Sequence, residues 1–222
     1  HNHNLSRDVA YRTTVDLLAE DPATAGEWAL PMDWPANAVH AILLHTGKVL
    51  WFRGDETIPT SYTWDPVTNQ LQSQTATAII WCGGNSILDD GRVLVTGGAT
   101  AQGASTGPRW AFIFDPLTLQ WTRTPDMRKG RYYPTNTVLG DGRTLVFSGT
   151  DEVGETNEQV EAFVVGGGAG GADLWDLLTA ANKKMSYYPR MHLLPTGEIL
   201  HTGPEKITDL FDPIAQTWQV LA

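Results

Sequence analysis

Two short segments of this chain combine residue types that could act together chemically. Ile80–Ser86 contains the only cysteine, Cys82, and Lys129–Asn136 contains the adjacent tyrosines Tyr132 and Tyr133. A thiol beside a phenol would be a functional pair. Each segment also has a purely structural interpretation, because a lone cysteine is usually a small buried hydrophobe and Tyr-Tyr-Pro can pack at a strand edge. The choice depends on whether folding brings the two segments together.

A repeat indicates how the two segments could meet. Four segments share an apolar run, a tight turn with glycine and a second apolar run, and glycine supplies the positive φ that such turns require. Three of the four units continue with an aromatic residue, an Asp-Pro turn and another strand. The turn glycines are Gly47, Gly91, Gly142 and Gly197, and the Asp-Pro motifs are Trp64–Pro66, Phe114–Pro116 and Phe211–Pro213.

Two hairpins in each unit, at a spacing near 50 residues, are typical of a four-stranded blade of a kelch-type β-propeller. We therefore predict an all-β fold with four blades in this chain; a β-sandwich with evenly spaced hairpins is the alternative. Equivalent positions in adjacent blades lie side by side near the ring axis, which would bring Cys82 close to one tyrosine. The third unit lacks the Asp-Pro motif and has a glycine-rich insertion, Gly166–Gly171, before a short helix or irregular strand.

Composition excludes several classes of protein. The 15 Lys and Arg residues against 25 Asp and Glu residues give a net charge of −10, which argues against a nucleic-acid partner. No apolar run approaches the roughly 18 residues of a membrane-spanning helix, so no membrane partner is expected. The single cysteine excludes an internal disulfide framework and a cysteine-rich zinc site.

Several charged residues have simple structural interpretations. The acidic cluster Asp151–Glu155, with Glu158 and Glu161, is interpreted as a solvated loop. His45 and His201 are interpreted as surface or strand-end residues. Arg190 is a candidate substrate-binding residue, because a guanidinium near the axis can hold a substrate oxygen; a salt bridge or a carbonyl partner between blades is the alternative.

The order of motifs resembles the galactose oxidase and glyoxal oxidase family of copper radical oxidases over roughly residues 26–218. The specific motifs are Trp81–Gly84 and Arg131–Pro134, whereas Asp-Gly-Arg and Asp-Pro occur in many kelch-like blades. Tyr188–Pro195 looks like the matching segment of the glyoxal oxidase branch. The region after Ser148 also lacks the tryptophan of the galactose oxidase branch.

The resemblance implies a chemistry for the pair. Cys82 and Tyr133 would form a thioether, the Tyr133 oxygen would bind copper, and Tyr132 and Trp81 would neighbour the cross-link. The cross-linked tyrosyl radical and copper would each take one electron. The implied activity is the two-electron oxidation of a primary alcohol or aldehyde by O₂, giving H₂O₂, in a secreted oxidoreductase; the chain does not begin with Met.

The remaining copper ligands of the family, an axial tyrosine and two histidines, match no motif here. The resemblance therefore implies an N-terminal arm at residues 1–25 and, at residues 26–222, the first four blades of a seven-bladed ring. The other blades and a C-terminal domain would come from a second polypeptide. The alternatives are a closed four-bladed ring and a non-catalytic propeller that binds protein or glycan through rim loops such as Ala99–Pro108 and Val164–Asp173.

Overall fold

The structure is a computed structural model that describes residues 22–28, 30–53, 60–76, 78–101 and 104–221. Contacts divide the chain into two units, His1–Pro35 and Ala36–Ala222. The described part of the first unit contains one short helix, α2 (Pro22–Ala25). Most of the predicted arm, residues 1–21, lies outside the described residues.

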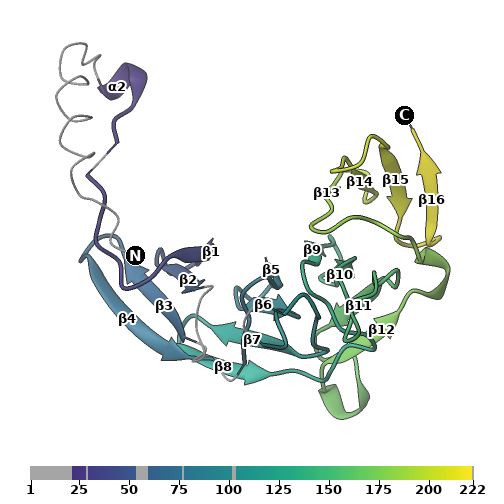
Figure 1. Ribbon diagram of the computed structural model, residues 1–222, viewed down its shortest axis with the longest axis horizontal. Helices are drawn as coiled ribbons and strands as arrows, with labels where there is room; N and C mark the ends of the chain where they lie inside the picture. Colours follow the sequence, from purple (N-terminus) through teal and green to yellow (C-terminus); the bar gives the residue numbers. More distant parts are fainter. Residues whose placement is uncertain (1–21, 29, 54–59, 77, 102–103, 222) are drawn as a thin grey trace. The chain divides into compact units, whose positions relative to one another are not determined.

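The second unit contains four antiparallel four-stranded sheets, each built from four consecutive strands (Figure 1). Every described strand within a sheet pairs with its neighbours along the chain. The strands are β1 (Ala38–Leu43), β2 (Val49–Arg53), β3 (Thr60–Asp65) and β4 (Gln70–Thr75); β5 (Gly84–Ile87), β6 (Val93–Thr96), β7 (Ala111–Asp115) and β8 (Gln120–Arg123); β9 (Thr135–Val138), β10 (Thr144–Phe147), β11 (Glu161–Val164) and β12 (Leu174–Leu177); and β13 (Met191–Leu193), β14 (Ile199–His201), β15 (Asp209–Asp212) and β16 (Thr217–Val220).

These four sheets are the blades of a β-propeller, so the predicted all-β fold with four four-stranded blades is confirmed. The β-sandwich alternative is wrong, because each repeat unit forms a sheet of its own among the described strands. The kelch type and the seven-bladed ring stay predictions.

Local chemistry determines the turns. The four turn glycines have φ between 79° and 90°, and each donates its backbone N–H to the carbonyl three residues earlier. At the Asp-Pro turns the aspartate accepts two backbone N–H groups. Asp115 Oδ1, for example, lies 2.8 Å from Leu117 N and 3.3 Å from Thr118 N. These hydrogen bonds to its charged form hold the pKa of Asp115 below its usual value.

Replacing Asp115 with alanine is expected to lower the free energy of unfolding by about 1 kcal/mol, the usual net contribution of a hydrogen bond. Urea unfolding followed by tryptophan fluorescence measures this loss. Asp126→Ala is the control, since Asp126 pairs with the exposed Arg123 at 2.7 Å and its carboxylate belongs to no Asp-Pro turn. An equal loss in both variants would contradict a specific role of the Asp-Pro turn.

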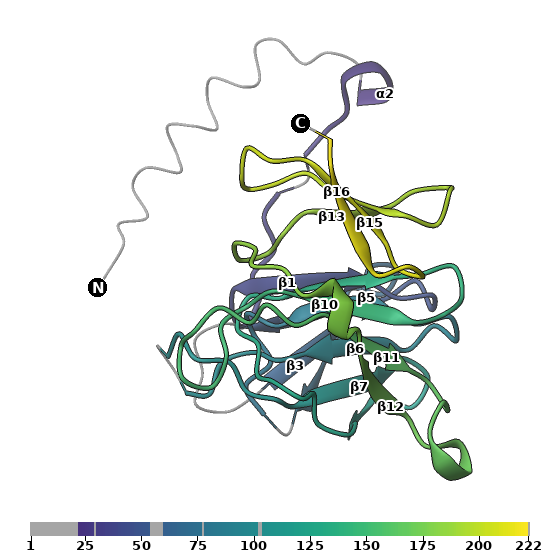
Figure 2. The same ribbon diagram turned by 90° about the vertical axis from the view of Figure 1, so that its right-hand side faces the viewer.

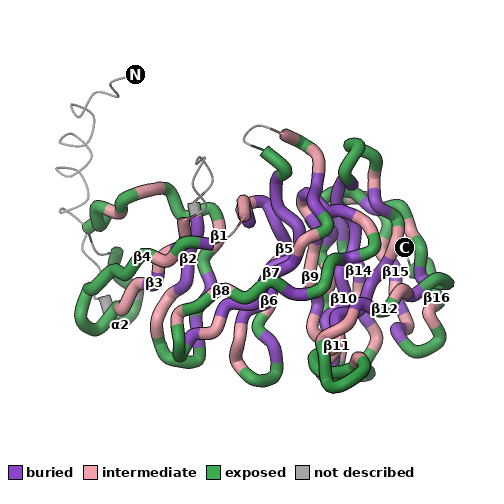
Figure 3. The backbone as a smooth tube through the Cα atoms, turned by 90° about the horizontal axis from the view of Figure 1, so that it is seen from below, coloured by how far each residue is buried: buried purple, intermediate pink, exposed green. Residues whose placement is uncertain are grey.

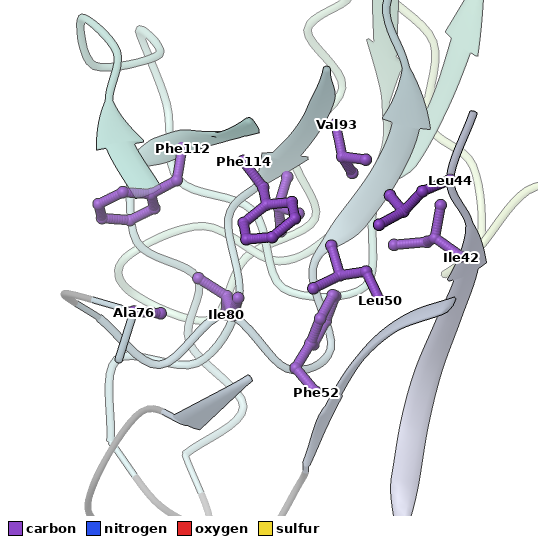
Figure 4. Close-up of a cluster of buried hydrophobic side chains, with 10 residues drawn as sticks. Ile42, Leu44, Leu50, Phe52, Ala76, Ile80, Val93, Phe112 and Phe114 are labelled. Atoms are coloured by element: carbon purple, nitrogen blue, oxygen red, sulfur yellow. The ribbon is translucent and has the colours of Figure 1, made fainter. Parts of the chain in front are cut away.

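Hydrophobic cores lie between consecutive blades, because alternate residues of a strand point to opposite faces of its sheet. Val93 packs with residues of the first blade, whereas its neighbour Leu94 packs with residues of the third. The close-up in Figure 4 shows side chains of the first two blades converging, with Leu50 and Phe52 approaching Phe114 and Val93. Burial is concentrated in the middle strands: all of β6 and β10 is buried, whereas β8 and β16 are largely exposed (Figure 3).

The outer part of the third blade differs from the others in sequence and yet completes the same sheet. Where the sequence predicts a short helix or an irregular strand, the chain forms β12, which pairs with β11. The ring of Trp175 on β12 is tilted against that of Phe163, with centroids 4.9 Å apart, and its indole N–H donates to Pro125 O at 2.8 Å. The glycine-rich insertion before it forms a protruding loop with a 3₁₀ turn at Ala169–Gly171 (Figure 2).

Candidate functional site

The predicted pair lies where the first strands of the second and third blades begin. Cys82 comes just before β5 and Tyr133 just before β9, and these two strands contact each other. Both residues precede the turn glycine of their unit by nine positions. Tyr188 occupies the same position in the fourth unit, just before β13, which also contacts β9. The repeat therefore presents one residue per blade at a common place.

Backbone hydrogen bonds connect these equivalent positions from blade to blade. Tyr133 N donates to Cys82 O at 2.9 Å, and Tyr188 N donates to Tyr133 O at 2.9 Å. All three residues have a positive φ, 61° at Cys82, 65° at Tyr133 and 48° at Tyr188. Residues with a Cβ rarely adopt this conformation, and it persists only where surrounding contacts impose it.

The side chains converge as well. Cys82 packs with Tyr132 in one buried cluster, and Tyr133 packs against it. The rings of Tyr132 and Tyr133 stack at 3.9 Å, and the rings of Tyr133 and Tyr188 lie 4.9 Å apart. Tyr132 donates its hydroxyl proton to the Tyr133 oxygen at 2.8 Å. Of the two tyrosines, Tyr133 is thus the hydrogen-bond acceptor, so its oxygen is better placed than that of Tyr132 to carry a negative charge.

Burial keeps this cluster in its protonated forms. It raises the pKa of the Cys82 thiol, although hydrogen bonds from the tyrosines oppose the shift. The hydrogen bond from Tyr132 lowers the pKa of Tyr133, but burial and the nearby thiol outweigh it, and the net pKa is raised. Burial also raises the pKa of Tyr132 and of Tyr188. At neutral pH a thiolate or phenolate here would therefore need a bound metal ion to form.

Apolar residues close the site on one side. Cys82, Ala99 and Tyr132 form a buried cluster, against which Trp81 and Ile79 pack. The Trp81 ring meets Tyr132 edge-on, with centroids 6.4 Å apart. Trp81 and Tyr132 therefore both lie beside Cys82, and their predicted roles stay predictions.

A buried ion pair anchors the backbone directly before the two tyrosines. Arg131 is fully buried; its guanidinium donates to Ser148 O and Gln159 O at 2.8 Å each and lies 3.1 Å from Glu161 Oε1. The interpretation of the acidic cluster as a solvated loop is wrong for Glu161 and for Asp151, which is buried and pairs with Lys129 at 2.6 Å. Glu161 is buried because it begins β11, in the middle of the third blade.

The other sequence candidates have different surroundings. Arg190 is exposed just before β13, and its backbone N–H donates to Gly203 O at 2.9 Å. His45 is exposed at a turn, as expected. His201 is the last residue of β14, so its strand-end interpretation is confirmed. Its surface interpretation is wrong, because the side chain is buried and its Nδ1 lies 3.2 Å from Asp209 Oδ2.

Sequence reasoning missed two residues that contact the site. Tyr188 could have been found, because it precedes its turn glycine by the same nine positions as Cys82 and Tyr133. His40 accepts the Cys82 backbone N–H through Nε2 at 3.2 Å. It lies seven positions before its turn glycine instead of nine, so the repeat in the sequence does not point to it.

The donor set for a metal is incomplete in this part of the chain. Across the described ranges, which end at residue 221, there is no group of three or more His, Cys, Asp or Glu side chains that could hold a metal ion. The Tyr133 oxygen can serve as one phenolate ligand, a type that copper accepts. In the same described ranges, no helix is long and apolar enough to cross a membrane.

Fold and site together define a β-propeller that holds a cysteine against a tyrosine between two adjacent blades. No family model matches the chain. Two galactose oxidases of Gibberella zeae, one of them from strain PH-1, are each 30% identical to it over 138 residues, covering 56% of this chain and 19% of the relative. Aldehyde oxidase GLOX of Vitis pseudoreticulata is 28% identical over 135 residues, covering 60% of this chain and 24% of the relative.

The chain is thus a homologue, at modest identity, of galactose oxidase and aldehyde oxidase GLOX. The match spans about a fifth to a quarter of the length of these relatives. Among solved structures, a fungal alcohol oxidase of the AA5 family in complex with copper is similar with a TM-score of 0.49 and 13% identity, covering 88% of this chain and 67% of that chain.

Proposed function

We propose that this chain is part of a copper-dependent oxidase that takes two electrons from a primary alcohol or aldehyde and passes them to O₂, giving H₂O₂. The observation that carries the proposal is the placement of Cys82 against Tyr133, with Tyr133 N donating to Cys82 O and Tyr133 packing against the buried cluster that contains Cys82. The homology to galactose oxidase and aldehyde oxidase GLOX supports an oxidase in general terms.

The pair would form a thioether between Cys82 Sγ and the ring carbon next to the Tyr133 hydroxyl. The thiol and the ring each lose one hydrogen atom, one carbon–sulfur bond forms, and O₂ takes up the two protons and two electrons as H₂O₂. A sulfur at this position stabilises the oxidised tyrosine. Copper, when bound, would supply the second one-electron acceptor that a two-electron oxidation needs.

The residues around the pair have definite tasks in this proposal. Tyr133 would bind copper through its oxygen, because this oxygen accepts the hydrogen bond from Tyr132 and needs little rearrangement to become a ligand. Trp81 and Tyr132 would shield the oxidised ring from water by their packing. Arg190 would hold a substrate oxygen.

The remaining copper ligands would come from a polypeptide segment beyond the described residues, since these contain no group of three metal-binding side chains. A second polypeptide supplying the C-terminal blades is one such source. We also propose an extracellular location, as the resemblance implies. The preferred alcohol or aldehyde depends on residues of those further segments.

The mass of the intact protein tests the cross-link. After exposure to copper and air, the denatured protein is expected to weigh two hydrogen atoms less than its sequence, and peptide mapping should recover a Cys82 peptide joined to a Tyr133 peptide. Cys82→Ser and Tyr133→Phe are expected to keep the unshifted mass, as is protein kept with a chelator under nitrogen.

An unshifted mass in copper and air, measured with the segment that supplies the remaining ligands present and with Cys82 still open to alkylation, would contradict the oxidase proposal. It would favour a non-catalytic propeller that binds protein or glycan through loops such as Val164–Asp173. A cross-link to Tyr132 or Tyr188 would contradict the choice of Tyr133, and Tyr132→Phe and Tyr188→Phe distinguish these cases.

A further inference from the structure

The acceptor of the Cys82 backbone N–H differs from its counterparts in the other blades. At Tyr133 and Tyr188 the N–H donates to the carbonyl of the equivalent residue in the preceding blade. For Cys82 that residue would be Ala38, nine positions before Gly47. The Cys82 N–H instead donates to the imidazole of His40, at 3.2 Å from Nε2.

An irregular strand pairing in the first blade allows the imidazole to replace the carbonyl as the acceptor. The pairing of β1 with β2 shifts register between Ala38 and His40. In the second and third blades the corresponding position, seven residues before the turn glycine, is held by Gly84 and Thr135, which are too short to reach a neighbouring blade in this way. The imidazole of His40 therefore takes over a contact that a main-chain carbonyl makes between the later blades.

The imidazole is held on several sides. Its ring stacks on Phe52 with centroids 5.0 Å apart and meets Tyr188 at 6.5 Å. Nδ1 lies 3.2 Å from the side-chain amide of Asn85. Burial lowers the pKa of His40 to about 4, so the ring is neutral at pH 7.

A neutral ring has one accepting and one donating nitrogen. Since a backbone N–H can only donate, Nε2 is the acceptor and Nδ1 carries the proton. The side-chain oxygen of Asn85 accepts a hydrogen bond from Nδ1–H once the amide oxygen and nitrogen are exchanged. Which of the two amide atoms is the oxygen is assigned from the hydrogen-bond partners. The ring is then satisfied at both nitrogens, and its orientation toward Cys82 is fixed.

We propose that His40 is a positioning residue that holds the Cys82 backbone in its left-handed conformation, so that the thiol faces the tyrosine hydroxyls. Without the acceptor, the Cys82 N–H loses its partner and the φ of 61° loses one of the contacts that impose it. The segment around Cys82 would then relax and expose the thiol. A role of His40 in catalysis rests on the proposed function, whereas its role in holding the Cys82 backbone does not.

The alkylation rate of Cys82 in copper-free protein tests the proposal. His40→Phe keeps a flat ring against Phe52 but has no acceptor, and we expect alkylation by iodoacetamide to become about tenfold faster, as for the loss of one hydrogen bond. His40→Gln places an amide oxygen at a reach similar to that of Nε2, and we expect the wild-type rate. His45→Phe is the matched control at an exposed turn and should also alkylate at the wild-type rate.

A His40→Phe protein that alkylates at the wild-type rate, or a His40→Gln protein that alkylates as fast as His40→Phe, would overturn the proposal. If His40→Phe fails to fold, His40→Asn replaces it, because its shorter amide cannot reach the Cys82 N–H and fast alkylation is again expected. Hydrogen exchange of the Cys82 amide gives a second readout and should speed up in the same variants.

The outcome is independent of whether the chain is an oxidase. If the mass of the intact protein never shifts in copper and air while His40→Phe still accelerates alkylation, the positioning role stands and the oxidase proposal fails. If the mass shifts in the wild type but alkylation does not respond to His40, the oxidase proposal stands and the positioning role fails.

Discussion

Tyr133→Phe is expected to lower the oxidase activity of the intact protein by about a thousandfold or more, the loss typical when a group that takes part in the reaction is removed. The phenylalanine ring keeps the stacking on Tyr132 and the tilted contact with Tyr188, but it offers no oxygen to copper and no hydroxyl next to the sulfur. Peroxide release with a primary alcohol or an aldehyde as substrate measures the effect.

Two further tyrosine variants make this result specific. Tyr132→Phe is expected to lose only about tenfold, because Tyr132 acts on the Tyr133 oxygen through a single donated hydrogen bond. Tyr62→Phe, in the first blade where Tyr62 stacks on Trp51 at 4.3 Å, should leave the activity unchanged. Equal losses at positions 132 and 133 would contradict the assignment of Tyr133 as the copper ligand.

Glu161→Gln is expected to lower the free energy of unfolding by about 3 kcal/mol, because it leaves the guanidinium of Arg131 charged and buried without a counterion. Both side chains are fully buried, so solvent cannot compensate. The amide retains the shape of the carboxylate but has one accepting oxygen in place of two, so one of the hydrogen bonds from Arg128 N and Arg131 is lost together with the charge. Urea unfolding measures the loss.

The matched control is Asp141→Asn, which removes a carboxylate that pairs with Arg143 at 2.8 Å on the surface and should cost less than about 1 kcal/mol. Replacing both buried partners, as Arg131→Met with Glu161→Leu, should recover part of the stability, because no unpaired charge then remains. A Glu161→Gln protein as stable as the wild type would show that the ion pair does not stabilise the fold.

The hairpin turns could be predicted from the sequence because each is determined by a few adjacent residues. Gly91 supplies its positive φ without help from the rest of the protein, and Asp115 bonds the two N–H groups that follow it. The period of these turns was enough to predict the blades and to place Cys82 and Tyr133 at equivalent positions.

Features that depend on tertiary contacts could not be predicted in the same way. The left-handed backbone at Cys82 and Tyr133 opposes the preference of both residue types and exists because hydrogen bonds between blades impose it. Glu161 belongs to an acidic segment in the sequence, yet the pairing of β11 with β10 buries it beside Arg131. The strand β12 forms without a turn motif because β11 offers it an edge.

The juxtaposition of Cys82 and Tyr133 also constrains the denatured chain. A covalent bond between these residues would close a loop of about 50 residues, which removes conformational entropy from the unfolded ensemble worth about 4 kcal/mol. The same bond would tie the second repeat to the third, so that the two could separate only partially during unfolding. Formation of the cross-link would therefore stabilise the fold, and a chain without the cross-link would be more sensitive to heat and proteolysis.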